Sequence, residues 1–316
     1  MNFGSNHKSF EIFFILSIII AQVICERFSE TNLPPGTIVV KPGKGTLSAA
    51  FTQLKGRKGK QFIFLKKGVY YDNAKLNDYE DGIIIQGEGG TKKSYLDNLV
   101  TIVSSVKGTG TSSALRINVP NVNVYSITFQ NTFGPGFQAV ALTANGDNHI
   151  YDRCAFLGFQ DTLYDYRGTH YFFGCYIEGA IDFIFGGGRS FYDNCVIGIK
   201  PNKGGVQEIT ANDAGSPGHL DSIFVFDSPN FVDLHGVPAA TTYYGRAWGP
   251  KPQVVIQNPN NFGSLHPDGW DPDGVGSIKF DGSDFRELPL KTKRGKPLKQ
   301  RITKERVLGD KFRYLS

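Results

Sequence analysis

Short apolar runs, each bounded by turn-forming or charged residues, recur along most of the 316-residue chain. They are about four to eight residues long, as expected for strands that are buried in a parallel stack. No long helical pattern separates them, so strand–helix–strand units fit poorly and a right-handed coil of short strands fits well. The predicted strands lie at 37–40, 61–65, 82–87, 122–129, 139–142, 150–156, 170–177, 191–197 and 222–226.

One segment departs from this pattern, because Leu47, Ala50, Phe51 and Leu54 have the spacing of one helical face. We expect a short amphipathic helix there that caps one end of the coil and shields its open core from water. The chain has 38 Gly, 25 Phe and 14 Tyr but a single Met, which favours pleated strands and tight corners. The sequence therefore predicts an all-β protein, a right-handed parallel β-helix in a single domain with a short N-terminal capping helix.

An internal period of 21 residues organises the middle of the chain. Three residue types recur at this separation: Cys154 and Cys175, Gly158 and Gly179, and Asp161 and Asp182. The series continues with Cys195, which lies 20 residues after Cys175. Such a period indicates that one coil takes about 20 residues and that corresponding residues stack on one another.

The stacked cysteines are candidates for a disulfide. Corresponding residues of adjacent coils lie about 4.8 Å apart, which falls within the Cα separations that a disulfide accepts. An oxidising compartment would permit one bridge, either Cys154 with Cys175 or Cys175 with Cys195, and would leave one thiol over.

The same stacking predicts that the carboxyl groups of Asp161 and Asp182 lie about 5 Å apart. Two carboxyl groups cannot both ionise readily at that distance, so the pKa of one should rise. One aspartate is then suited to act as an acid and the other as a nucleophile or base. The alternative is that aspartate recurs as a turn or ladder residue of the scaffold. Against it, the position seven residues after Cys195 holds Asn202, which indicates that the scaffold requires no acid there.

Neutral amides and a cation accompany the two acids. Gln138 and Gln160 could stabilise an oxyanion, although a lone glutamine is more commonly a surface or ladder residue of a solenoid. Arg246 could keep one carboxylate ionised and Trp248 could stack on a sugar ring, the alternatives being a surface ion pair and a packed aromatic. The six His are scattered, and the sequence has no zinc-ligand spacing, serine-hydrolase elbow or phosphate loop.

The two ends differ from the middle. Residues 1–25 are expected to be a secretory signal peptide, because the apolar run at 12–21 is short for a transmembrane span; a membrane anchor is the alternative. Residues 26–285 form the expected main domain. The tail at 286–316 has 11 Lys and Arg against 3 Asp and Glu, a net +8 against −3 for the remainder. It either binds an anionic polymer or is a solvated end, and a nucleic-acid partner is not expected.

Four segments resemble the main motifs of the pectin methylesterases, or pectinesterases, in order and spacing. They lie at 138–142, 158–164, 179–186 and 245–248, and the resemblance extends over about 37–270. It implies a right-handed parallel β-helix that removes methyl groups from the galacturonate carboxyls of pectin with neither metal nor cofactor. Residues 26–285 would then be the catalytic domain.

Carried over by motif, the resemblance implies that Asp182 is the nucleophile that attacks the ester carbonyl. Asp161 would protonate the departing methanol and then activate water, which is covalent carboxylate catalysis in two steps. The resemblance also implies that Gln138 and Gln160 donate hydrogen bonds to the oxyanion and that Arg246 holds Asp182. Trp248 and Phe185 would line the sugar cleft.

We therefore expect a secreted, extracellular monomer that acts on the homogalacturonan of cell walls and is free of the membrane once the signal peptide is cleaved. Two other interpretations remain. A β-helix pectate lyase or polygalacturonase would need a calcium site or a third central aspartate, and the sequence shows neither. A non-catalytic solenoid would bind wall polysaccharide through its cleft and basic tail.

Overall fold

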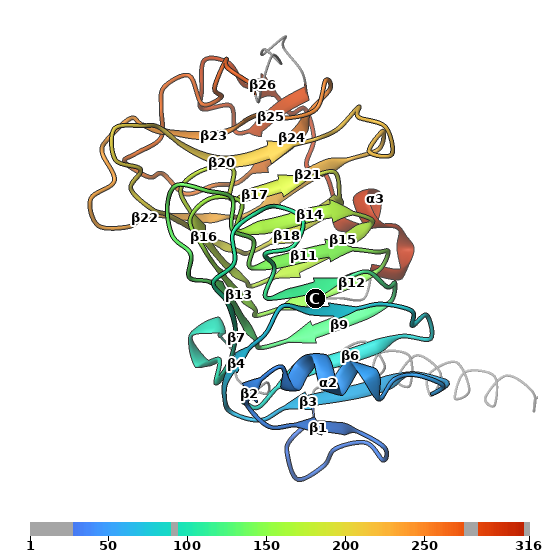
Figure 1. Cartoon of the computed structure of the whole chain (residues 1–316). Helices are drawn as coiled ribbons and strands as arrows, with labels where there is room; N and C mark the ends of the chain where they lie inside the picture. The colour runs from blue at the N-terminus through green and yellow to red at the C-terminus, as the bar shows by residue number, and fades with distance from the viewer. Residues whose placement is uncertain (1–27, 90–93, 275–283, 313–316) are drawn as a thin grey trace, which may run out of the picture.

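The computed structural model describes residues 28–89, 94–274 and 284–312, so the expected signal peptide at 1–25 lies outside the described residues. Within them the chain winds into coils that stack along one axis (Figure 1). Successive coils each add one strand to three parallel sheets. Because such parallel crossovers are right-handed, the architecture is the right-handed parallel β-helix that the sequence predicts.

The three sheets are called A, B and C, and all of their strand pairs are parallel. Sheet A contains, in spatial order, β1 (Ile38–Val40), β3 (Gln61–Leu65), β6 (Ile83–Gly87), β9 (Val122–Tyr125), β12 (His149–Asp152), β15 (Thr169–Phe173), β18 (Arg189–Asp193), β21 (Ile223–Asp227), β24 (Gln253–Gln257), β25 (Asp284–Leu288) and β26 (Lys296–Pro297). Sheet B contains β2 (Gly43–Lys44), β4 (Gly68–Tyr71), β7 (Val100–Ser104), β10 (Thr128–Asn131), β13 (Ala155–Leu157), β16 (Tyr176–Gly179), β19 (Val196–Ile199) and β22 (Asn230–Asp233). Sheet C contains β5 (Ala74–Leu76), β8 (Leu115–Ile117), β11 (Leu142–Asn145), β14 (Leu163–Arg167), β17 (Ile184–Gly186), β20 (Gln207–Asn212) and β23 (Thr242–Ala247).

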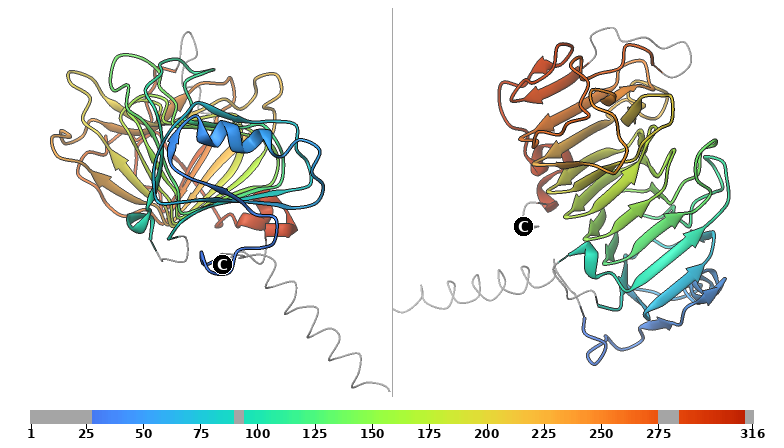
Figure 2. Two further views of the ribbon diagram at one scale, coloured as in Figure 1. Left: turned by 60° about the horizontal axis from the view of Figure 1, so that its bottom comes forward. Right: turned by 90° about the vertical axis from the view of Figure 1, so that its left-hand side faces the viewer.

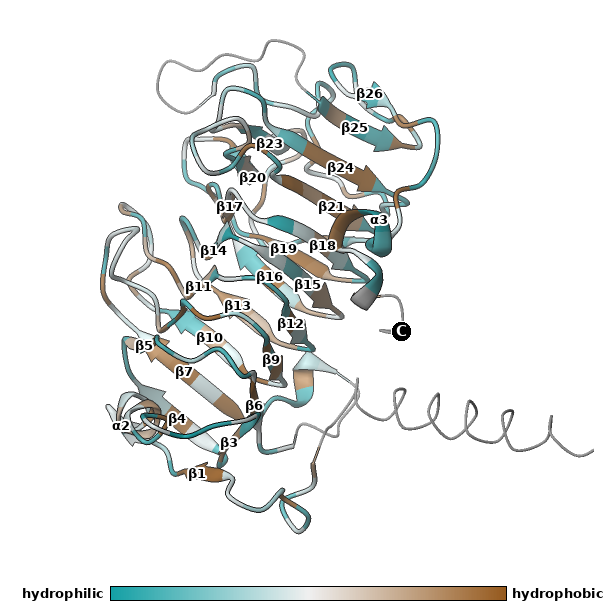
Figure 3. Ribbon diagram, turned by 90° about the vertical axis from the view of Figure 1, so that its right-hand side faces the viewer, coloured by the Kyte–Doolittle hydropathy of each residue, from teal (hydrophilic) through white to brown (hydrophobic). Residues whose placement is uncertain are grey.

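The core is a set of side-chain columns that run from coil to coil. Tyr151, Phe172, Tyr192 and Phe226 come from successive strands of sheet A, and their stacked rings have centroid separations of 4.8, 4.6 and 4.4 Å. All four are fully buried, and burial of each such ring stabilises the fold by about 1.5–3 kcal/mol. Figure 3 shows the same feature as apolar stretches along β6, β21 and β24, with hydrophilic loops between the strands.

Four of the predicted strands are wrong in extent, because each contains a corner at which the chain passes from sheet A to sheet B. The corner residues are Ser126, Arg153, Gly174 and Asn194, with φ of 54°, 51°, 56° and 50°. A single residue in the left-handed region turns the chain, and the strands on both sides face the same core. Hydropathy therefore does not mark the corner in the runs at 122–129, 150–156, 170–177 and 191–197.

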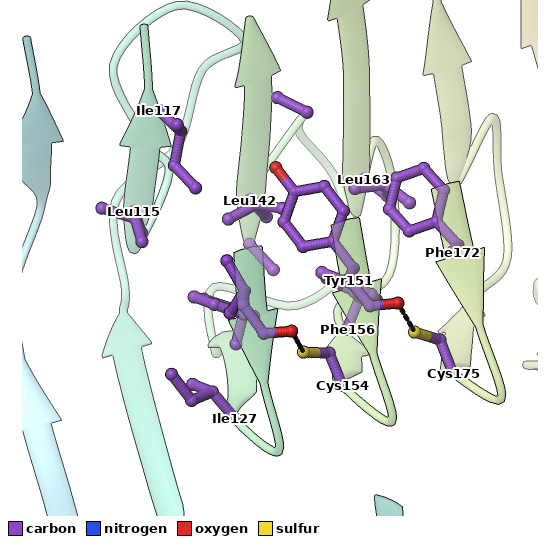
Figure 4. Packing of buried hydrophobic residues seen from close by; sticks show 14 of the residues in the cluster. Leu115, Ile117, Ile127, Leu142, Tyr151, Cys154, Phe156, Leu163, Phe172 and Cys175 are labelled. Carbon is purple, nitrogen blue, oxygen red and sulfur yellow. Dashed lines mark hydrogen bonds between the residues drawn. The ribbon is translucent and has the colours of Figure 1, made fainter. Parts of the chain in front are cut away.

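The three cysteines follow these corners directly, and all three are buried free thiols. The expected disulfide is therefore not formed. Cys154, Cys175 and Cys195 occupy equivalent positions on parallel coils, and each thiol turns toward the chain of the preceding coil. Figure 4 shows this for Cys154 and Cys175. Their acceptors are the carbonyl oxygens of Val124, Tyr151 and Phe172, at 3.6, 3.3 and 3.5 Å.

One end of the coil is covered by α2 (Thr46–Thr52), which lies across the interior beside β1 (Figure 2). Leu47, Ala50 and Phe51 are buried, so the predicted capping helix is confirmed. A single 3₁₀ turn, η1 (Tyr95–Asp97), lies between β6 and β7.

The described part of the basic segment 286–316 packs on the β-helix and is not a solvated end. Its first residue lies inside β25, and the chain then returns along sheet A to α3 (Lys304–Leu308) and η2 (Asp310–Phe312). Five of its residues pack in a buried cluster against the outer face of sheet A: Leu298, Ile302, Val307, Leu308 and Phe312. Within the described ranges, no helix is long and apolar enough to cross a membrane.

Candidate active site

Asp161 and Asp182 lie at the corners where the chain passes from sheet B to sheet C. Gln160 and Ile181 form a parallel bridge, and the Asp161 N–H donates to the carbonyl oxygen of Ile181 at 3.1 Å. The two acids are therefore neighbours on adjacent coils, as the 21-residue period indicates. Their φ angles are 61° and 46°, a left-handed conformation that aspartate adopts more readily than most residues and that often accompanies function.

Asp161 is in a state suited to donating a proton. Its side chain is only slightly exposed, at 7% for the residue. Burial raises the pKa of Asp161 to about 8 and the charge of Asp182 adds to the rise, whereas Arg246 and a hydrogen bond with Thr109 oppose it. Asp161 therefore keeps its proton at neutral pH.

Asp182 differs from Asp161 because a cation binds it directly. The Arg246 Nε donates to Asp182 Oδ1 at 2.8 Å and Nη2 donates to Oδ2 at 2.6 Å. The pKa of Asp182 is raised overall, because burial outweighs these hydrogen bonds and the charge of Arg246, which lower it. Burial alone would lower the pKa of Arg246, but Asp182 raises it well above its usual range. Such a bidentate, charge-assisted pair favours an ionised Asp182 beside a protonated Asp161.

The two predicted amide donors lie on adjacent coils at the same corner. The Ala139 N–H donates to the carbonyl oxygen of Gln160 at 3.0 Å, and Gly108 N–H donates to that of Gln138 at 2.6 Å. Gln138 is exposed and Gln160 is half-buried, so neither side chain is enclosed in the core.

An aromatic wall stands beside the acids. Phe185 stacks on Tyr164 with centroids 4.3 Å apart, and Trp248 lies 5.4 Å from Phe185. Phe185 is 2% exposed, so it supports the wall from beneath, and the half-buried Tyr164 and Trp248 offer the accessible ring surface. Tyr164 is not among the predicted site residues, although it precedes Phe185 by the same 21-residue period.

Sequence reasoning also missed a third acid, Glu208, and the inference from Asn202 is wrong. Ile184 pairs with Thr210 and the Glu208 N–H donates to the carbonyl oxygen of Ala180, so Glu208 lies beside residues 180–184 on the next coil. Asn202 lies in the connection between β19 and β20, which spans residues 200–206 and is longer than the corresponding connection of the preceding coil, residues 180–183. Glu208 is a glutamate, so it does not supply the third central aspartate whose absence argued against a lyase or polygalacturonase.

Glu208 belongs to the same charge cluster. It is 5% exposed, and its Oε1 lies 3.7 Å from Arg246 Nη1. Burial raises the pKa of Glu208 to about 8, with Arg246 opposing and Asp182 and Asp271 adding to the rise. Among the described residues, no group of three or more His, Cys, Asp and Glu side chains is arranged to hold a metal ion, and the cation beside these carboxyls is the Arg246 guanidinium.

Comparison with known proteins gives one consistent result. A sequence profile of the Pectinesterase family matches residues 37–296. Probable pectinesterase A of Aspergillus fumigatus is 31% identical over 260 residues, which cover 80% of this chain and 78% of that protein. Putative pectinesterase 14 of Arabidopsis thaliana is 30% identical over 259 residues, covering 78% and 75%.

Solved structures agree with the sequence comparison. The pectin methylesterase from Aspergillus niger matches with a TM-score of 0.79 and 26% identity, covering 92% of this chain and 99% of its own. The carrot pectin methylesterase matches with a TM-score of 0.70 and 25% identity, covering 81% and 82%. The chain therefore belongs to the pectinesterase family and is an enzyme, a hydrolase of pectin methyl esters.

Proposed function

We propose that the enzyme demethylates methyl-esterified homogalacturonan by covalent catalysis, with Asp182 as nucleophile and Asp161 as acid and base. The observation that carries this proposal is the unequal environment of two neighbouring carboxyls. Arg246 binds Asp182 through two hydrogen bonds of 2.8 and 2.6 Å, whereas burial raises the pKa of Asp161 to about 8.

In the first step, a carboxylate oxygen of Asp182 attacks the ester carbonyl carbon and the carbonyl oxygen becomes an oxyanion. The amide groups of Gln138 and Gln160 donate to this oxyanion, an interaction that strengthens as charge develops. The intermediate collapses with cleavage of the C–OCH₃ bond, and Asp161 gives its proton to the departing methanol. An acyl anhydride now joins the sugar carboxyl to Asp182.

In the second step, Asp161 is ionised and takes a proton from water as the water oxygen attacks the same carbonyl carbon. Collapse of the second tetrahedral intermediate breaks the bond to Asp182, which leaves as a carboxylate. The product is a free galacturonic acid carboxyl that ionises in water. Both enzyme carboxyls thereby return to their starting protonation states.

The aromatic wall is proposed to position the sugar chain. Trp248 and Tyr164 are half-buried, so each offers part of a ring to a pyranose, and Phe185 fixes their positions from below at 5.4 and 4.3 Å. We further propose that the protein is secreted through the signal peptide at 1–25, and that it acts outside the cell as a monomer.

The test is an assay of methanol release from highly methylated pectin with wild-type enzyme, Asp182→Asn and Asp161→Asn. We expect both variants to lose activity, Asp182→Asn most severely because it lacks the nucleophile. Full activity of folded Asp182→Asn would overturn the mechanism. Absence of methanol release from the wild type would overturn the function, and new reducing ends or unsaturated products would indicate a glycosidase or a lyase instead.

The extracellular location has a separate test. Expression of the full chain in a eukaryotic secretion host should yield protein in the medium whose N-terminus lies near residue 26. Size-exclusion chromatography with light scattering on that product measures its mass, and a value close to twice that of the chain would contradict the monomer.

A further inference from the structure

Glu208 is an ionisable residue of this site to which the proposed reaction gives no role. Its N–H donates to the carbonyl oxygen of Ala180 at 3.0 Å, and two positions further on Thr210 of β20 pairs with Ile184 of β17. The backbone therefore fixes Glu208 on the next coil, immediately beside the nucleophile.

The guanidinium of Arg246 lies between the two carboxyl groups and uses different edges for each. Its Nε and Nη2 bind Asp182 at 2.8 and 2.6 Å, and its remaining nitrogen, Nη1, lies 3.7 Å from Glu208 Oε1. A guanidinium is a rigid planar fork, so a group at Nη1 limits rotation of the edge that faces Asp182. At 3.7 Å the contact between Nη1 and Oε1 is longer than a direct hydrogen bond. Glu208 therefore acts on Arg246 electrostatically and by occupying the space beside Nη1.

We propose that Glu208 is a positioning residue of this enzyme: it restrains the Nη1 side of Arg246 and so keeps the Nε and Nη2 edge aligned on Asp182. This inference rests on the proposed function, because it assigns Glu208 a role through the nucleophile's partner. Glu208 touches neither the substrate carbonyl nor the leaving group in this role, so it acts only through Arg246.

The protonation state of Glu208 matters to this role. The titratable and charged groups that surround it are Asp182, Arg246, Tyr243, which pairs with it across sheet C, and Asp271. Because burial raises its pKa to about 8, Glu208 keeps its proton below that pH. Arg246 then faces a neutral carboxyl oxygen of Glu208, and Asp182 does not compete with a second carboxylate for the guanidinium charge. Above that pH, ionised Glu208 competes with Asp182 for the same cation.

The experiment compares Glu208→Gln with Glu208→Ala. Glutamine has the size and neutral carbonyl oxygen of protonated glutamic acid, so we expect its kcat at pH 6 to stay within about two-fold of the wild type. Alanine leaves the Nη1 side open, and we expect kcat to fall about ten-fold with little change in KM, as for loss of orientation at a reacting group. The acid limb of its kcat profile should move to higher pH, because a loosened Arg246 stabilises the Asp182 carboxylate less.

A matched control is Glu178→Gln, which alters a half-buried glutamate of sheet B that pairs with Lys200 at 2.5 Å. We expect its kcat and pH profile to match the wild type. Equal loss of kcat in Glu208→Gln and Glu208→Ala would overturn the positioning role, and so would full activity of Glu208→Ala. If Glu208→Ala does not fold, a folded Glu208→Gln that loses more than about five-fold in kcat at pH 6 overturns it as well.

A second readout separates this inference from the proposed function. Carbon-13 NMR of labelled carboxyl groups follows the titration of Asp182 without any turnover. We expect its titration midpoint to rise by about one unit in Glu208→Ala and to stay near the wild-type value below pH 8 in Glu208→Gln. An unchanged midpoint in Glu208→Ala refutes the role of Glu208, whereas failure of the wild type to release methanol refutes the proposed function.

Discussion

Replacement of Arg246 by glutamine gives the most direct test of how the site keeps its nucleophile charged. The side chain of Asp182 is 10% exposed, and Arg246 supplies both of its short charge-assisted hydrogen bonds, at 2.6 and 2.8 Å. Without the guanidinium, Asp182 keeps the desolvation that raises its pKa and loses the interaction that lowers it. The carboxylate form therefore becomes rarer at every pH below the new midpoint.

The size of the effect follows from this change. Loss of an opposite charge in contact with a carboxylate raises its pKa by about 1–3 units, and each unit corresponds to about 1.4 kcal/mol. At a pH well below the wild-type midpoint of Asp182 we therefore expect kcat to fall about 10- to 1,000-fold, and the acid limb of the profile to move to higher pH by the same 1–3 units. Part of the lost activity should return as the pH is raised.

The assay is methanol release from methylated pectin between pH 5 and pH 9, with circular dichroism to establish folding. Arg246→Lys should retain part of the activity, since lysine keeps the charge but loses the bidentate geometry. Arg286→Gln is the control, because Arg286 is 41% exposed and pairs with Asp284 at the surface. An acid limb of Arg246→Gln that coincides with that of the wild type would refute the reasoning.

Three further predictions follow. Asp161→Asn should be more thermally stable than the wild type near pH 8 and about equal to it near pH 4. The reason is that a carboxyl with a folded-state pKa of about 8 destabilises the fold increasingly as pH rises between those values. Melting temperatures of both proteins at both pH values check this, and a difference between variant and wild type that is the same at pH 4 and pH 8 contradicts it. Trp248→Ala should raise KM for pectin several-fold with a smaller change in kcat, since stacking on a sugar is lost, and an unchanged KM counts against the aromatic wall. The unfolded chain from residue 26 onward should react with a thiol reagent at Cys154, Cys175 and Cys195 without prior reduction. A single reactive thiol would instead show that a disulfide joins the other two cysteines.

The coil architecture could be predicted from the sequence because adjacent coils repeat chemically similar residues at nearly constant spacing. The positions of the corners between sheets A and B could not, since Arg153 and Asn194 separate strands that face a common core. A helix or a solvent-facing hairpin changes the hydropathy period where it ends. A β-helix corner changes one backbone φ angle and leaves the apolar pattern continuous.

Residues of the candidate site could be predicted where the number of residues per coil is constant, and could not be predicted where it changes. Asp161 and Asp182 share a period, and Tyr164 could have been found from Phe185 by the same arithmetic. Glu208 could not, because the connection between β19 and β20 is longer than the one between β16 and β17 and breaks the count from Cys195. Only the hydrogen-bond register of sheet C, in which Ile184 pairs with Thr210, reveals the acid.

The long connection between β19 and β20 has a consequence for how such enzymes diversify. Residues 200–206 enlarge one coil, yet β20 returns to regular pairing with β17 and β23. Loops of a solenoid can thus lengthen or shorten at one coil while the neighbouring coils stay in place. We expect insertions at this connection to change the surface beside the site while the pairing of β20 with β17 and β23 is kept.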